Sequence, residues 1–200
     1  MKHRLAAGLL AFYLLLSSCV GVDATARIAA NGSVSLDLAY TVSLAADELG
    51  RNGDNAAYLP LPTERAGFQA SVESSGGRVD AWAKNDGTDR FVVTAKLFFP
   101  TLESFVAFME SAGTRPSLSR EGGRTALSME LGTSQPPRNA DLAAFVTEVF
   151  SDYSVSLTLA LPATPQNVVG ATVSGRNVRF VMQSSSIYLS EQPVLVSVRW

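Results

Sequence analysis

Residues 31–43 read NGSVSLDLAYTVS, and this stretch decides the fold. Every second residue from Val34 to Val42 is apolar, and the residues between them are small or polar. A two-residue period is that of a β-strand with one buried and one solvent-facing side. The Asn31-Gly32 pair in front of the strand is a strong signal for a tight hairpin turn. The stretch therefore predicts a half-buried antiparallel strand, paired through this turn with a short strand over residues 27–30.

The same alternation recurs further along the chain, and turn residues separate the alternating segments. It predicts strands over residues 79–84, 90–99, 127–131, 153–161, 178–182 and 194–200. Two other segments place apolar residues on one helical face, and they follow the good capping residues Thr101 and Asn139. A third helix is expected from about residue 63 to residue 73. The fold class is therefore α+β: a curved antiparallel sheet with two or three helices packed on one face, the concave one.

The first eighteen residues have the composition of a secretory signal peptide. A positive start, Met1 to Arg4, precedes the uncharged stretch LAAGLLAFYLLL over residues 5–16. As a helix those residues would span roughly 18 Å at ~1.5 Å each, well short of the ~30 Å hydrocarbon core of a bilayer. A signal peptide is therefore favoured over a stable transmembrane helix.

The segment Leu16-Ser17-Ser18-Cys19 resembles the bacterial lipobox, an aliphatic residue followed by two small residues and a cysteine. In proteins with that motif the cysteine carries lipid and the signal is cut directly before it. The resemblance implies lipidation at Cys19, and several acyl chains would anchor the protein permanently where one chain would not. We expect residues 1–18 to be the signal peptide, 19–25 a lipidated tether and 26–200 a single α+β domain.

Composition narrows the functional classes. The chain has one histidine, His3, and one cysteine, Cys19, so the domain after the leader has no histidine and no free thiol. Ser-His-Asp and Cys-His catalysis and the usual zinc, haem and iron–sulfur sites need these residues. The whole chain has 16 basic and 18 acidic residues; without Lys2 and Arg4, 14 basic residues remain and the net charge becomes −4. We expect no enzyme, no cofactor, no metal and no nucleic-acid partner.

Large apolar side chains are concentrated where helices would meet the sheet. Phe98 and Phe99 are adjacent in an expected strand, so each face of that strand carries one aromatic ring. These side chains form either a filled core or the lining of an apolar cavity. For a cavity, the candidate ligand-binding residues are Phe98, Phe105, Val106, Met109, Phe145 and Val149.

The lipobox, the strand over residues 31–43 and the late segment Gly175-Arg176-Asn177-Val178-Arg179-Phe180 together resemble the LppM-like bacterial lipoprotein domain. That family implies a curved sheet over helices, an apolar cavity and lipid binding in the cell envelope. We therefore expect a membrane-anchored envelope lipoprotein that binds a lipid or another apolar ligand. The alternative is a structural or assembly module that docks envelope proteins through a sheet edge or the Trp200 end. In Gram-negative hosts, a lipoprotein with aspartate directly after the lipidated cysteine is retained in the inner membrane. This chain has Val20 at that position, which favours the outer membrane in such a host.

Overall fold

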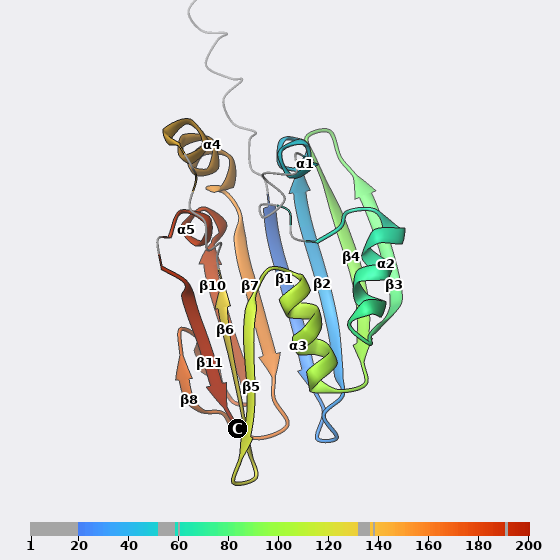
Figure 1. Cartoon of the computed structure of the whole chain (residues 1–200), viewed down its shortest axis with the longest axis vertical. Coiled ribbons are helices and arrows are strands. Elements are labelled where there is room, and N and C mark those ends of the chain that lie inside the picture. The colour runs from blue at the N-terminus through green and yellow to red at the C-terminus, as the bar shows by residue number, and fades with distance from the viewer. Residues whose placement is uncertain (1–19, 52–58, 60, 132–136, 138, 191) are drawn as a thin grey trace, which may run out of the picture.

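The computed structural model describes residues 20–51, 59, 61–131, 137, 139–190 and 192–200, and the side chain of Val149 lies outside this set. Within these residues, eleven strands and five helices form two curved sheets with helices packed against them (Figure 1). The predicted α+β class is confirmed. The structure adds a second sheet and one parallel strand pair to the single antiparallel sheet expected from the sequence.

The larger sheet has seven strands in the order β3-β4-β2-β1-β7-β10-β9. Its strands are β1 (Val20–Ile28), β2 (Val34–Ser43), β3 (Arg78–Asp86), β4 (Arg90–Phe99), β7 (Ser154–Ala160), β9 (Thr172–Ser174) and β10 (Asn177–Gln183). The smaller sheet has the order β5-β6-β11-β8. Its strands are β5 (Arg115–Glu121), β6 (Arg124–Leu131), β8 (Gln166–Val169) and β11 (Val194–Arg199). The helices are α1 (Leu44–Arg51), α2 (Arg65–Ser74), α3 (Leu102–Ser111), α4 (Ala140–Phe150) and α5 (Ser184–Leu189).

The stretch over residues 31–43 forms the hairpin turn and strand β2, as predicted. In the turn, the Gly32 amide donates to the Ala29 carbonyl at 2.9 Å, and Gly32 has a φ of +87°, which a side chain would disfavour. Strand β2 pairs with β1 on one side and β4 on the other. Its alternating apolar residues are all buried, and Tyr40 has no exposed surface.

The prediction that residues 20–25 form a tether is wrong, because β1 begins at Val20. This strand pairs with β2 along its whole length and, in parallel, with β7 from Val22 to Arg27. Its inward residues are Val20, Val22, Ala24, Ala26 and Ile28. The two alanines are too weakly apolar to mark a strand in sequence, but hydrogen bonds on both sides place this segment at the centre of the sheet. Cys19 and the predicted signal peptide lie outside the described residues.

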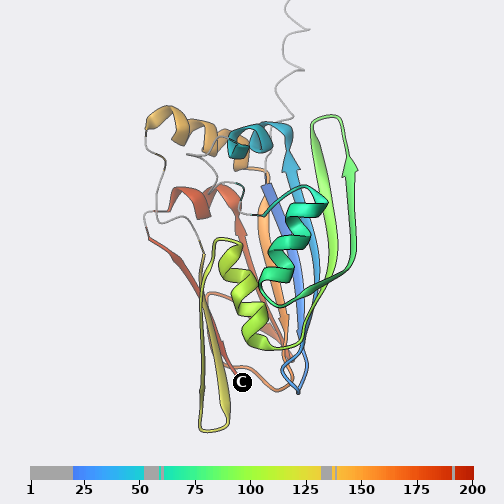
Figure 2. The ribbon, with the colours of Figure 1, turned by 45° about the vertical axis from the view of Figure 1, so that its right-hand side comes forward.

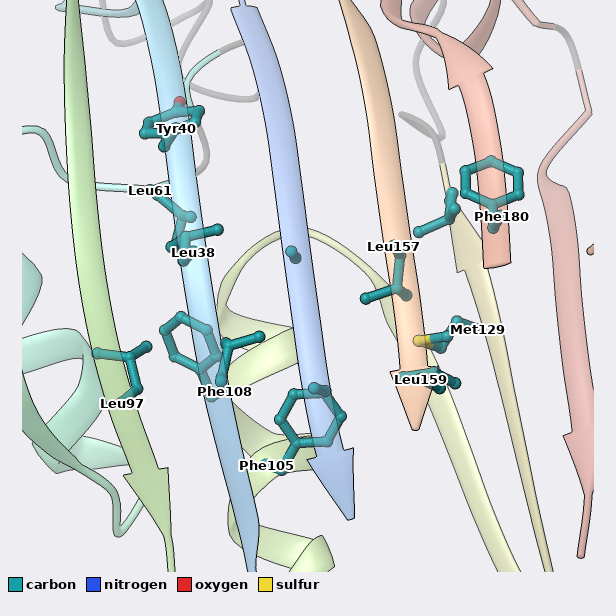
Figure 3. Packing of buried hydrophobic residues seen from close by; sticks show 14 of the residues in the cluster. Leu38, Tyr40, Leu61, Leu97, Phe105, Phe108, Met129, Leu157, Leu159 and Phe180 are labelled. Carbon is teal, nitrogen blue, oxygen red and sulfur yellow. The ribbon is translucent and has the colours of Figure 1, made fainter. Parts of the chain in front are cut away.

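Helices and the smaller sheet share the inner face of the larger sheet (Figures 1 and 2). Helices α2 and α3 lie over the β3-β4-β2 half, where the ring of Phe99 packs 5.7 Å from Phe105 and 5.3 Å from Phe108. The inward residues of β6 and β11 join the same core from the other side, and Figure 3 labels Met129 of β6 and Leu159 of β7 among the residues of this cluster. The predicted caps are confirmed: Thr101 accepts from the Ser104 amide at 3.1 Å, and Asn139 accepts from Leu142 at 2.8 Å.

Candidate functional site

A cavity of about 490 Å³ lies where the larger sheet, the end of α3, helix α5 and the start of the smaller sheet meet. This volume is within the ~300–1,000 Å³ range of small-molecule sites. The lining residues come from seven strands or helices and the segments between them: Val20, Val22, Ala24, Leu36, Leu38, Tyr40, Leu61, Phe108, Met109, Ala112, Gly113, Thr114, Arg115, Leu131, Val155, Ser156, Leu157, Ile187 and Tyr188. Figure 3 shows Leu38 and Tyr40 along β2, Leu157 on β7 and Phe108 from α3.

The cavity exists because α3 ends before it covers the whole inner face of the larger sheet. Gly113 has a φ of +82°, and the Thr114 amide and hydroxyl both donate to the Met109 carbonyl, at 3.1 and 2.6 Å. The chain then leaves as β5, so α3 covers one part of the sheet and β6 another (Figure 2). Between them, β1 presents a small side chain, Ala24, at the centre of the cavity wall.

The cavity opens at the α3–β5 junction. Gly113 and Arg115 are exposed lining residues there, and Met109, Ala112 and Thr114 are half-buried. At the other end the lining residues Val20, Tyr40, Leu61, Ile187 and Tyr188 are all buried. The cavity therefore has a solvent-facing opening and a deep end.

The deep end contains a polar group. Tyr40 Oη has almost no accessible surface, and the described residue closest to partnering it is Leu61, through its backbone. Burial raises the pKa of the Tyr40 hydroxyl well above its usual range, and Tyr188 and Asp47 raise it further, while the Leu61 backbone offsets part of the effect. Tyr40 is therefore a neutral hydrogen-bond donor at any physiological pH.

A buried carboxylate lies beyond this tyrosine. The side chain of Asp47 is 9% exposed and forms an ion pair with Arg51 at 2.6 Å. Its Oδ1 atom also accepts a hydrogen bond from Thr63 Oγ1 at 3.3 Å. Within the described part of the chain, no three acidic, histidine or cysteine side chains lie close enough to hold a metal ion.

One of the six predicted ligand-binding residues, Met109, lines the cavity. Phe98 faces the other side of the sheet, where the Arg78 guanidinium lies 4.0 Å above its ring. Phe105 is fully buried but packs against Phe99 in the closed part of the core.

The remaining predicted residues lie elsewhere. Val106 is half-buried in a shallow outer groove between α3 and β5, together with Glu103 and Arg120. Phe145 is half-buried on α4, away from the cavity wall. The side chain of Val149 is outside the described set, as is Cys19.

The sequence did not identify most of the residues that line the cavity. Phe108 on α3 and Ala112, the C-cap of this helix, are four residues apart, and the helical period starting from Phe105 could have identified them beside Met109. Tyr40 was recognised as inward-facing on β2. No local signal places it beside Tyr188, because the two residues meet only through the pairing of distant segments.

Comparison with solved structures finds a likeness to the folded domain of LppM from Mycobacterium tuberculosis, determined by NMR. The match has a TM-score of 0.53 and 18% sequence identity, and it covers 92% of this chain and 90% of that one. No protein-family model and no curated protein matches the chain. The predicted resemblance to the LppM-like domain is thus confirmed at the level of the fold. No helix among the described residues is long and apolar enough to cross a bilayer.

Proposed function

We propose that this chain is a membrane-anchored lipoprotein of the cell envelope, and that its domain binds the acyl chain of a lipid. The observation that carries the proposal is the 490 Å³ cavity with its predominantly aliphatic and aromatic wall. A methylene group is close in size to a water molecule, which occupies ~30 Å³ in the liquid, so the volume suits roughly sixteen carbons. One acyl chain of ordinary length fills such a space.

The energetics favour this class of ligand. Transfer of each methylene group from water to an apolar wall contributes about 0.8 kcal/mol. A long chain therefore gains substantial affinity without any charged contact. The single exposed cation among the lining residues, Arg115, lies at the opening and not along the wall.

The anchor part of the proposal rests on Cys19 in its lipobox context. Strand β1 begins directly after this cysteine. An anchored domain would therefore be held against its membrane without a spacer. In a Gram-negative host, Val20 favours the outer membrane.

A pair of substitutions on one helix tests the binding function. Ala112, the C-cap of α3, lines the opening of the cavity, whereas Ala107 within the helix is exposed and lines the outer groove. Ala112→Phe should weaken binding of a fluorescent fatty-acid probe to residues 20–200 by at least about tenfold, because the ring occupies the opening. Ala107→Phe should bind the probe as the unmodified protein does.

Native mass spectrometry of the same protein should also show a co-purified lipid, removable by organic extraction. Absence of both bound lipid and probe binding would refute the proposal. The alternative function, an assembly module that docks envelope proteins through a sheet edge, would then be favoured. The Trp200 end is less suited to docking, because the Trp200 backbone pairs with Thr125 through two 2.9 Å hydrogen bonds and its side chain packs on the core.

A further inference from the structure

The first residue of β1 is fixed in the domain, and it directly follows the cysteine of the lipobox. Val20 lies opposite Val42 in the sheet register, and its carbonyl accepts a hydrogen bond from the Ser184 hydroxyl at 2.7 Å. The Cα atoms of consecutive residues are only about 3.8 Å apart. A lipid on Cys19 would therefore hold the end of the larger sheet at which β1 begins directly against the bilayer.

The strand pairing identifies the helices that share this end. Strand β7 is parallel to β1 and therefore begins at the same end, and α4 comes shortly before it in the chain. Strand β2 is antiparallel to β1 and finishes at this end, where α1 follows it without a break. Because β2 and β7 are the two neighbours of β1, α1 and α4 lie on either side of the point where β1 begins. Figure 2 shows both helices lying across the ends of the strands.

The charges at this end select the kind of lipid surface that it can face. Arg51 is the single basic residue of α1 and α4, and it forms an ion pair with Asp47 at 2.6 Å. At the start of the neighbouring strand β4, Arg90 is paired with Asp89 at 2.8 Å. These two cations are therefore already engaged and would not attract anionic headgroups. The exposed residues of the helices include Leu44, which is 50% exposed, so a zwitterionic phospholipid surface is the better match.

We propose that α1 and α4 form the membrane-facing end of the domain, with Leu44 against the headgroups of a zwitterionic bilayer. The direct junction of Cys19 with β1 sets this orientation, so the inference rests on the anchor in the proposed function. The strands of the larger sheet then lead away from the membrane. The α3–β5 junction, where the cavity opens, lies apart from α1 and α4, so docking through this end leaves the opening uncovered (Figure 2).

The test imposes the anchor chemically and measures which end of the domain meets the lipid. Residues 19–200, which contain the continuous core, are coupled through Cys19, the only cysteine, to a maleimide-bearing diacylglycerol in phosphatidylcholine vesicles with brominated chains. Bromine quenches tryptophan emission at short range, so the variants are Leu44→Trp and, as a control, Val173→Trp. The two replaced side chains are matched, at 50% and 51% exposed. The register through β10 and β7 places Val173 level with Ala26, six residues along β1 from Val20, so at ~3.3 Å per residue it lies roughly 20 Å farther from the bilayer.

We expect the emission added by Leu44→Trp to be quenched at least about threefold more than that added by Val173→Trp, because of the extra distance along the strands. A flexible spacer of glycine and serine between Cys19 and Val20 should remove most of this difference, since the domain could then turn either end toward the bilayer. Thermal melting of each variant checks that it is folded.

Two results would overturn the inference: equal quenching at the two positions, or a difference that the spacer does not reduce. Either would leave the proposed lipid binding and the anchor intact, and equal quenching would make α1 and α4 available to a protein partner. Absence of fatty-acid labelling at Cys19 in cells would instead refute the anchor in the proposed function, because the chemical coupling measures the orientation independently of cellular lipidation.

Discussion

Two alanines on β1 provide a direct test of whether the cavity is real space in solution. Ala24 and Ala26 both face inward, two residues apart on the same strand. Ala24 lies between Leu38 and Leu157 in the sheet register and lines the cavity. Ala26 has no exposed surface and does not line it. Leucine at each position adds the same three carbons to two different surroundings.

The expected free energies of unfolding have opposite signs. At Ala24 the added carbons enter the cavity, and at about 0.8 kcal/mol per methylene they stabilise the fold by up to about 2 kcal/mol. At Ala26 they overpack a closed core, which costs about 1–3 kcal/mol. With the gain and the cost near the middle of these ranges, the two variants should differ in free energy of unfolding by about 3 kcal/mol. For a domain of this size, 1 kcal/mol shifts Tm by about 2–4 °C, so the difference in Tm should be roughly 6–12 °C.

The assay is calorimetric or urea-induced unfolding of residues 20–200 after lipid extraction, because a ligand bound to the native state raises its apparent stability. Ala24→Leu should melt at or above the unmodified protein, and Ala26→Leu well below it. Ala24→Leu should also bind the fatty-acid probe more weakly. If Ala24→Leu melts as low as Ala26→Leu, the space beside Ala24 is closed, and the reasoning from the cavity is wrong.

Three further predictions concern other parts of the chain. Cys19→Ser should abolish incorporation of an alkyne fatty acid in metabolic labelling and block removal of the leader; equal labelling of the variant would contradict the lipoprotein assignment. Asp37 has its pKa lowered first by its hydrogen bond to Arg27, so its stabilising contribution is present at neutral pH and is lost as the pH falls through that lowered value. Asp37→Asn should thus cost about 0.5 kcal/mol in urea unfolding at pH 7, a value discounted for solvent screening, and progressively less as the pH falls through the lowered pKa of Asp37; a pH-independent difference would argue against the ion pair. Gly77→Ala should cost about 1–3 kcal/mol in thermal unfolding, because a Cβ atom there would lie 2.5 Å from the ring of buried Phe99, and a neutral result would show that this ring can move.

Local patterns in the sequence were sufficient for much of the fold. The alternation in residues 31–43 identified β2, and Thr101 and Asn139 identified the starts of α3 and α4. These features depend only on residues close together in the chain. Side chains alternate between the two faces of a strand, and a capping side chain accepts from a free amide at the start of its own helix. The same reasoning correctly put Phe98 and Phe99 on opposite faces of their strand. It could not tell which of those faces would be covered by helices.

The sequence by itself determined the α+β class, the main strand, the helix starts and the shortage of the side chains that most enzymes and metal sites need. Only the tertiary structure decided that β1 lies between β2 and β7, that a second sheet covers part of the first, and that Tyr40 and Tyr188 meet in one cavity wall. The physical reason is that a strand's partners and a cavity's volume depend on contacts between segments far apart in the chain. The cavity is the space left where α3 ends before the smaller sheet begins to cover the larger one, and no single segment encodes that space.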